Sequence, residues 1–305
     1  MQNKLILRLS NNLGNQMFMY ASGYAFSKEL NRDLLIDNES SYIRKKNSHT
    51  KYNLDLFRIS AKHANKNLKY IGTMGHFKRK LYKYLNIFKK KKFFYVEHKS
   101  KDKITFYNTD FMKNNYDSNL FIEGYFESEK YFLKYKNEIR KEFSFKLYKN
   151  YLNNPLYNDI KNSNSVCVCL RQNRFSEGKG PITSEKSIKS QIFSREQSQY
   201  IVKCINIMEN KIPNAKFFLW SNDYNKIFDY LPKEKFTVVK TNEIGLDLFL
   251  MTQSKHYIMI PSSFNWWGCW LSDHDNKIVL RPSENFFSNY HLNNTDFWPE
   301  NWIKV

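Results

Sequence analysis

The sequence opens with a short apolar run, at Leu5, Ile6, Leu7 and Leu9. The run is too short for a helix and predicts a buried strand. Residues 10–15 are mostly turn formers and predict a turn, in which Gly14 can adopt a positive φ. Apolar residues then recur at helical spacing, at Met17, Ala21, Tyr24 and Ala25, while Lys28, Glu29 and Arg32 are expected at the solvent side and far end of this helix. The N-terminus of such a helix offers N–H groups to an anion or a sugar hydroxyl, although any first βα unit shows the same pattern.

Strands alternate with helices along the rest of the chain. Buried strands are predicted to begin at residues 121, 165, 217, 236 and 257, and helices are predicted over residues 128–139, 200–212 and 247–256. Ser128 is the expected N-cap of the first of these helices. Residues 176–194 are polar and predict a loop that closes over a substrate. The pattern predicts an α/β fold with two domains, 1–160 and 161–305, because turn formers gather around Pro155.

Lysines and aromatic residues are interleaved over residues 76–103. This composition favours a basic amphipathic helix that lies on anionic lipid. The alternative interpretation is a solvated basic face whose aromatic side chains lie in the core. Residues 42–53 are polar and predict a surface loop facing an acceptor.

Composition adds a strong charge to this picture. The 305 residues carry a net charge of +20, and 41% of them are hydrophobic, as in a soluble globular protein. So large a charge predicts an acidic partner, and a phosphorylated sugar donor, an anionic membrane surface and a nucleic acid all satisfy it.

The cysteines show neither a disulfide framework nor metal-ligand spacing, and they are Cys167, Cys169, Cys204 and Cys269. We therefore expect reduced thiols in a cytoplasmic protein. The first apolar run, between Lys4 and Arg8, is too short for a secretory signal. No run of about 18 apolar residues occurs, so the membrane contact that we expect is peripheral, at the inner membrane.

Polar groups follow three of the predicted strands. Arg171 and Arg174 come after the strand at residue 165, Asp223 follows the next strand, and Ser262 and Ser263 follow the strand at residue 257. Parallel sheets bind ligands at the carboxyl ends of their strands. Two of these features have a structural alternative, which is a surface salt bridge for Arg171 and a helix N-cap for Asp223.

Several stretches resemble the α-1,2-fucosyltransferases of glycosyltransferase family 11. The matching phrases are Leu-Gly-Asn-Gln-Met-Phe-x-Tyr-Ala at residues 13–21, Gly-Tyr-Phe-x-Ser-Glu-Lys-Tyr-Phe at 124–132, Asp-Leu-x-Leu-Met-x-x-x-Lys-His at 247–256, Ser-Ser-Phe-x-Trp-Trp-Gly-x-Trp-Leu at 262–271, and residues 297–302. Asn11 or Asn12 stands where the family usually has glycines. Of the family phrase His-x-Arg-Arg-Gly-Asp-Tyr this chain keeps only the first arginine, as Arg171, with Asn173 at the glycine position and Arg174 at the aspartate position.

The resemblance implies an α/β fold of the GT-B type, with two Rossmann-like domains facing a cleft. It also implies inverting transfer of L-fucose from GDP-β-L-fucose to a galactose hydroxyl, giving an α-1,2 linkage on a bacterial surface glycan, which can be lipid-linked. The implied diphosphate ligands are Arg171, Arg174, Ser262, Ser263 and the Phe264 backbone. Gly14 and Asn15 would orient donor or acceptor, and Asp223 would bind ribose or base.

An inverting transfer needs a base for the acceptor proton. Glu177 and Asp37 are the candidates from the sequence. No aspartate pair of metal-binding type accompanies the motifs, so we expect a reaction without metal or other cofactor.

Two alternatives remain open. The altered arginine phrase also suits another GDP-deoxysugar, such as GDP-colitose. The charge suits a non-catalytic nucleic-acid-binding protein, but no nucleic-acid motif accompanies the basic residues, so we expect no nucleic-acid partner.

Overall fold

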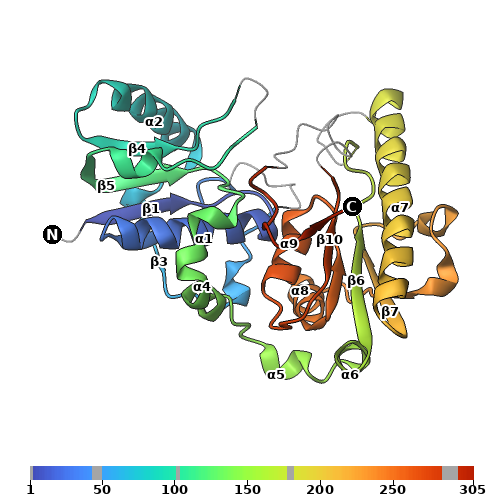
Figure 1. Cartoon of the computed structure of the whole chain (residues 1–305). Helices are drawn as coiled ribbons and strands as arrows, with labels where there is room; N and C mark the ends of the chain where they lie inside the picture. The colour runs from blue at the N-terminus through green and yellow to red at the C-terminus, as the bar shows by residue number, and fades with distance from the viewer. Residues whose placement is uncertain (1–2, 43–49, 101–103, 177–181, 284–294) are drawn as a thin grey trace. The chain divides into compact units, whose positions relative to one another are not determined.

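The computed structural model describes residues 3–42, 50–100, 104–176, 182–283 and 295–305, which belong to two compact units (Figure 1). The first unit is Met1–Lys146 with Asn289–Pro299, and the second is Leu147–Ser288 with Glu300–Val305. The division after Lys146 precedes the predicted boundary at residue 160. The reason is that the helices α5 (Tyr148–Tyr151) and α6 (Pro155–Asn162) pack inside the second unit, where the rings of Tyr151 and Tyr157 contact the ring of Phe249.

The first unit is built on a parallel five-stranded sheet. Its strands run in the order β3 (Lys62–His63), β2 (Asp33–Asp37), β1 (Lys4–Arg8), β5 (Tyr116–Glu123) and β4 (Lys92–Val96). The predicted strand at the start of the chain is therefore the centre of the sheet. Leu5, Ile6 and Leu7 are fully buried there, which explains a continuous apolar run instead of an alternating one.

The helices of this unit are α1 (Leu13–Glu29), α2 (Gly72–Leu85), α3 (Asp110–Lys113) and α4 (Lys136–Glu142). The long helix α1 departs from the amphipathic pattern that its apolar spacing predicted. Nearly every residue from Leu13 to Ser27 is buried, on all sides of the helix. Small and hydroxyl residues such as Ser22 and Gly23 let neighbouring segments approach, so α1 is a central helix of the unit and has no broad solvent face.

The predicted helix over residues 128–139 is broken in the structure. Ser128 does cap, and its hydroxyl accepts from the N–H of Lys130, but the cap starts only the 3₁₀ turn Glu129–Tyr131. A second 3₁₀ turn, Leu133–Tyr135, precedes α4. Tyr131 and Phe132 are buried by these turns, so packing of the aromatic side chains overrides a continuous helical path.

A late segment of the chain returns to the first unit. The carboxylate of Asp296 accepts from the N–H of Tyr107 at 3.0 Å and pairs with Lys130 Nζ at 2.9 Å. The ring of Phe297 lies 6.0 Å, between centroids, from that of Phe18 on α1. Residues separated by most of the sequence thus share one core.

The second unit has a parallel six-stranded sheet. Its order is β11 (Ile303–Lys304), β10 (Val279–Arg281), β9 (His256–Ile258), β6 (Asn164–Leu170), β7 (Ala215–Ser221) and β8 (Phe236–Val238). The chain runs outward from β6 to β8, returns beside β6 at β9, and continues outward on the other side. This is the strand order of dinucleotide-binding folds.

The helices α7 (Ser184–Lys211), α8 (Ile244–Gln253) and α9 (Ser263–Trp270) complete the second unit. The prediction of a loop over residues 176–194 is wrong from Ser184 onward. Thr183 caps α7 by accepting from the N–H of Lys186, and good helix formers such as Glu185, Lys186 and Lys189 lie on its exposed first turns. Residues 177–181 of that predicted loop lie outside the described part of the chain.

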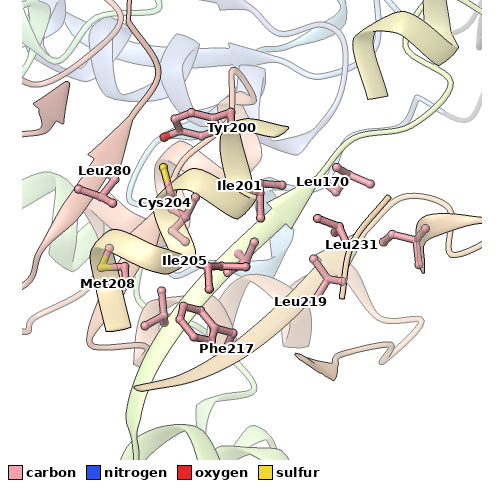
Figure 2. Packing of buried hydrophobic residues seen from close by; sticks show 14 of the residues in the cluster. Leu170, Tyr200, Ile201, Cys204, Ile205, Met208, Phe217, Leu219, Leu231 and Leu280 are labelled. Atoms are coloured by element: carbon pink, nitrogen blue, oxygen red, sulfur yellow. The ribbon is translucent and has the colours of Figure 1, made fainter. Parts of the chain in front are cut away.

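The core of the second unit lies between α7 and the sheet (Figure 2). Its helical face carries Tyr200, Ile201, Cys204, Ile205 and Met208, which pack on Leu170, Phe217 and Leu219 of the strands. All four cysteines are free and buried. Cys167 and Cys169 lie on one face of β6, as predicted, with their Sγ atoms 3.9 Å apart.

Candidate active site

The strand order of the second unit places a topological switch point between β6 and β9. The chain leaves β6 in one direction and β9 in the other, and sheets of this kind bind their ligands at the carboxyl ends of the strands at such a point. Arg171 is the first residue after β6, and Ser262 and Ser263 follow β9. The predicted phosphate ligands therefore come from the two strands that flank the switch point.

The backbone of Arg171 is held by the helix α7. Gln197, which is fully buried, donates from Nε2 to the carbonyl of Arg171 at 2.9 Å and accepts the N–H of Arg171 on Oε1 at 3.2 Å. These bonds replace the sheet ladder, which has ended at Leu170. The base of the Arg171 side chain is thereby fixed at the strand end.

Arg174 connects the loop after β6 with the loop after β9. Its Nη1 lies 3.5 Å from the carbonyl oxygen of Pro261, and its guanidinium lies over the ring of Phe193 at 5.6 Å. A guanidinium held against an aromatic face loses little freedom when it binds an anion. Arg171 and Arg174 thus bring positive charge to the same edge of the sheet.

The helix α9 begins directly at this edge. Ser262 is its N-cap, has an extended backbone (φ −143°), and makes no side-chain capping bond. The first N–H groups of a helix lack intrahelical acceptors, and the helix dipole favours negative charge at this end. The start of α9, with Ser262, Ser263 and Phe264, is suited to an anionic oxygen. Behind it, Trp266, Trp267 and Trp270 are buried in the core of the unit.

The loops after β6 and β7 are joined by reciprocal amide bonds. The N–H of Gln172 donates to Asn222 Oδ1 at 2.8 Å, and Asn222 Nδ2 donates to the carbonyl of Gln172 at 3.0 Å. Asn173 Nδ2 donates to Asp223 Oδ2 at 2.8 Å. The geometry of the arginine loop is therefore set partly by the neighbouring strand end.

Asp223 caps a turn instead of the helix predicted from Tyr224. Its Oδ1 accepts from the N–H of Asn225 at 2.9 Å, and the next helical turn starts only at Ile227. Beside it lies a hollow of about 280 Å³, lined by Ser221, Asn222, Asp223, Tyr224, Asn225, Lys240, Thr241, Asn242 and Asp247. Burial raises the pKa of Asp247. Lys240 and Thr241 were not predicted as site residues, because β8 is short and its end carries no motif.

The first unit has its own polar edge, where β1, β2 and β5 end. Gly14 and Asn15 lie in the first turn of α1, and Asn15 Nδ2 donates to Glu127 Oε1 at 2.7 Å. Gln16 is fully buried and donates to the carbonyls of Asn11 and Lys51. Sequence reasoning did not single out Glu127, which has other polar residues close to it at Glu123, Ser128 and Glu129.

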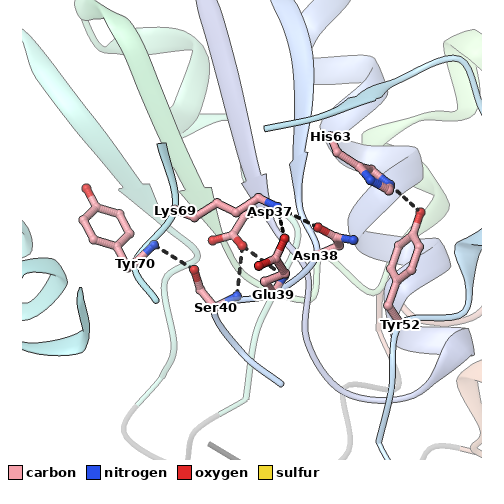
Figure 3. A network of polar contacts seen from close by, with 8 residues as sticks. All are labelled: Asp37, Asn38, Glu39, Ser40, Tyr52, His63, Lys69 and Tyr70. Carbon is pink, nitrogen blue, oxygen red and sulfur yellow. Dashed lines mark hydrogen bonds and ion pairs between the residues drawn. The ribbon is translucent and has the colours of Figure 1, made fainter. Parts of the chain in front are cut away.

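Asp37 lies at the end of β2 in a network of polar contacts (Figure 3). Its side chain is 1% exposed, and Oδ1 accepts the N–H groups of Glu39 at 3.2 Å and Ser40 at 3.0 Å. Lys69 closes the same turn through bonds to Asn38 and Glu39. Asp37 therefore has a turn-forming role, and a role as base stays a prediction.

Glu177, the other predicted base, lies outside the described residues. Within the part of the chain that the structure describes, no cluster of three or more His, Cys, Asp or Glu side chains is arranged to bind a metal ion. No described helix is both long and apolar enough to cross a bilayer.

Comparisons with known proteins cover almost the whole chain. The family profile "Glycosyl transferase family 11" matches residues 2–305. An alpha-1,2-colitosyltransferase of Escherichia coli is 29% identical over 99% of this chain and 98% of its own. The O-antigen biosynthesis glycosyltransferase WbnK of Escherichia coli is 24% identical over 97% of this chain and 99% of its own.

Two solved structures share the fold. A mutant of Arabidopsis thaliana FUT1 in complex with GDP matches with a TM-score of 0.53, at 13% identity, over 94% of this chain and 72% of that one. NodZ alpha-1,6-fucosyltransferase, crystallised with GDP, matches with a TM-score of 0.50, at 14% identity, over 88% of this chain and 92% of that one. The predicted α/β fold of the GT-B type, with two Rossmann-like units, is confirmed. From the match over its whole length, the chain belongs to glycosyltransferase family 11.

Proposed function

We propose that this glycosyltransferase transfers L-fucose from GDP-β-L-fucose to a galactose hydroxyl of a bacterial surface glycan, forming an α-1,2 linkage. The observation that carries the proposal is the switch point of the second unit, where Arg171, Arg174 and the start of α9 gather. Two positive side chains and a helix N-terminus at one strand edge suit a diphosphate. Both structural neighbours were solved with GDP, which is in keeping with this choice of donor.

The hollow at the ends of β7 and β8 is suited to the nucleoside part of the donor. Asn222, Asp223 and Lys240 offer amide, carboxylate and ammonium groups there. A carboxylate accepts from ribose hydroxyls or from a purine N–H. The Asp223 side chain would then hold both the arginine loop, through Asn173, and the nucleoside.

The transfer needs one bond made and one broken at the anomeric carbon. The acceptor oxygen bonds to that carbon from the face opposite GDP, and the bond to the diphosphate oxygen breaks with its electron pair. Arg171 and Arg174 would stabilise the charge on the leaving diphosphate. The acceptor proton goes to a base, for which we propose Glu127, since Asn15 orients its carboxylate in the first turn of α1.

A second donor, GDP-colitose, is favoured by one relative. Colitose is L-fucose without the 3-hydroxyl, and the E. coli relative of 29% identity is an alpha-1,2-colitosyltransferase. A pocket that hydrogen-bonds a hydroxyl rejects the analogue lacking it strongly, whereas a pocket without such a partner discriminates weakly. Competition between the two donors in a transfer assay separates the alternatives, and NMR of the product gives its linkage.

Calorimetry of GDP and GDP-fucose tests the donor site directly. The wild type should bind both, and Arg171→Ala should weaken GDP binding about tenfold to hundredfold, as for a lost hydrogen bond to a charged group. Arg195→Ala, an exposed arginine on α7, is the matched control and should bind as the wild type does. No binding of GDP by the wild type would overturn the proposal.

Metal independence is part of the proposal, because the two arginines supply the charge that a divalent cation would otherwise provide. Transfer should therefore continue at the same rate in EDTA. A rate that EDTA abolishes and Mg²⁺ or Mn²⁺ restores would show that the arginines do not suffice.

A further inference from the structure

The helix α2 and the 3₁₀ turn Asn86–Phe88 carry large apolar side chains in solvent. They are Met74, Phe77, Leu81, Tyr84, Leu85, Ile87 and Phe88. Met74 is 78% exposed, Phe77 65% and Phe88 71%. Within α2 the positions follow steps of three and four residues, so they form one stripe along the helix. We call these seven residues the apolar stripe.

The opposite face of α2 carries two basic side chains that form ion pairs. Arg79 Nη1 pairs with the carboxylate of Glu123 at 2.6 Å, and Lys83 pairs with the same carboxylate at the end of β5. Glu123 is only 8% exposed. The usual order of a surface helix, with ions in solvent and apolar groups inside, is reversed here.

The inner contacts fix the rotation of α2. The ring of Tyr82 meets those of Tyr70 and Phe93 edge to face. Gly75 lies so close to the backbone of Tyr70 that an added Cβ would be 2.4 Å from its carbonyl carbon. A rotation that buried the apolar stripe would break the Glu123 ion pairs and this close approach. The exposure of the stripe is therefore built into the packing of the unit.

Lysines border the apolar stripe. At 100° per residue, Lys78 and Lys80 fall on its two sides, and Lys89, Lys90 and Lys91 follow its end. All five are exposed. An apolar stripe flanked by lysines is the pattern of a helix that lies in the plane of an anionic bilayer surface.

For residues 76–103 the sequence allowed two interpretations, a helix lying on lipid or a basic surface whose aromatic side chains lie in the core. The structure supports a different one for each part of this segment. The helix α2 covers Gly72–Leu85, whereas Lys92–Val96, in the later part of the segment, is the edge strand β4. On that strand Phe94 and Tyr95 are buried, as the core interpretation expected. On α2 and the following turn Phe77, Tyr84 and Phe88 face solvent instead.

We propose that the apolar stripe, with its flanking lysines, binds the surface of an anionic lipid bilayer. Phosphate-rich nucleic acid would match the lysines but not seven large apolar side chains. A second copy would match the apolar side chains but would bring two sets of lysines together. The overall charge of +20 favours the approach to anionic lipid at low salt. This inference does not depend on the identity of the sugar donor.

Co-sedimentation of the full chain with phosphatidylglycerol-containing vesicles tests the proposal. The wild type should bind these vesicles and not vesicles of phosphatidylcholine alone. The triple variant Met74→Ser, Phe77→Ser, Phe88→Ser should bind at least tenfold more weakly. The matched control, Phe106→Ser, Leu133→Ser, Leu147→Ser, removes three apolar side chains elsewhere that are 46–47% exposed, and it should bind normally.

Two further measurements test the role of the lysines and the location of the contact. Lys89→Gln, Lys90→Gln, Lys91→Gln should weaken binding more than Lys141→Gln, Lys146→Gln, Lys149→Gln, which removes the same charge from exposed lysines elsewhere. Because the native cysteines are all buried, a polarity-sensitive dye on Phe77→Cys reports from the stripe alone. Its emission should shift to the blue with anionic vesicles, whereas a dye on Leu133→Cys should not respond.

Three results would overturn the proposal. The first is that the wild type does not co-sediment with anionic vesicles at low salt. The second is equal binding by the stripe variant and its control, which would leave only general charge attraction. The third is a concentration-dependent dimer that Phe77→Ser dissociates while vesicle binding is absent, which would assign the stripe to a second copy.

Discussion

Gln197 and Arg171 form a reciprocal pair of hydrogen bonds between a side-chain amide and a backbone, with lengths of 2.9 and 3.2 Å. The amide thus continues the sheet ladder by one residue past the end of β6. Gln197 is fully buried, and its Nε2 also lies 3.2 Å from the carbonyl of Phe193. The backbone position of the proposed phosphate ligand therefore depends on a residue that is itself fully buried.

Gln197→Leu should weaken GDP binding although the arginine remains. The substitution leaves the N–H and carbonyl of Arg171 without this partner, at a cost of about 1–3 kcal/mol in unfolding free energy. Calorimetry well below the melting temperature measures GDP binding on folded protein. Gln197→Glu keeps the acceptor and should be intermediate. A variant that loses stability but binds GDP normally would limit Gln197 to a structural role.

Glu127→Gln should lower kcat about a hundredfold or more and leave KM nearly unchanged, because the amide cannot take the acceptor proton. The exposed Glu138→Gln in the same unit is the control. Asp37→Asn should instead reduce thermal stability at nearly constant kcat, given its turn-forming bonds. A large loss of kcat in Asp37→Asn with little change in Glu127→Gln would exchange the two assignments.

Acid should destabilise the second unit through His256. Burial, with smaller contributions from His274 and Lys255, lowers the pKa of His256 from 6.5 to about 4, and its Nδ1 accepts the N–H of Ile278. The unfolded chain takes up the proton first, so the stabilisation is complete above pH 6.5 and is lost as pH falls towards 4, by about 2–3 kcal/mol. Denaturant unfolding across this range should show a shallower loss in His256→Asn, whose Oδ1 keeps the acceptor. The same change at the exposed His63 should leave the slope intact.

Gly268→Ala and Gly23→Ala should differ although both glycines lie in helices. A Cβ on Gly268 of α9 would meet Met251 Cβ of α8 at 2.8 Å, an atom fixed to the backbone. A Cβ on Gly23 would meet Leu7 Cδ2, the far end of a side chain, at the same distance. We expect Gly268→Ala to lose about 1–2 kcal/mol and Gly23→Ala to stay within about 1 kcal/mol of the wild type, since alanine favours helix. Equal melting curves for both would contradict this.

Local patterns located β1, β5, β6, β7, β8 and β9, because buried parallel strands are continuous apolar runs, but they did not locate β3, β4, β10 or β11. The same patterns missed the first half of α7 and the all-round burial of α1. Both errors have one cause, since the polarity of a helix depends on what packs against it, which local spacing does not contain. Glu127 was missed for a related reason: its partner Asn15 is 112 residues away in the sequence.

Two of the asparagines at which the chain departs from the family phrases can be explained by their backbone conformation. Asn173, and either Asn11 or Asn12, stand where the family usually has glycine. Asn11 and Asn173 both adopt a left-handed backbone, with φ of 67° and 56°. Asparagine tolerates this region better than other residues with a Cβ. The turns therefore keep their backbone shape, and the two asparagine amides gain contacts, to Tyr125 and Asp223, that glycine cannot make.

The return of residues 295–299 to the first unit affects the order in which the protein is made. A ribosome synthesises all of residues 147–288 before Asp296. The contacts of Asp296 with Tyr107 and Lys130 therefore cannot form until most of the second unit has been produced. The rings around Phe18 likewise lack Phe297 during that interval. A fragment ending at Lys146 would carry this incomplete core permanently, which makes the first unit a poor choice for expression by itself.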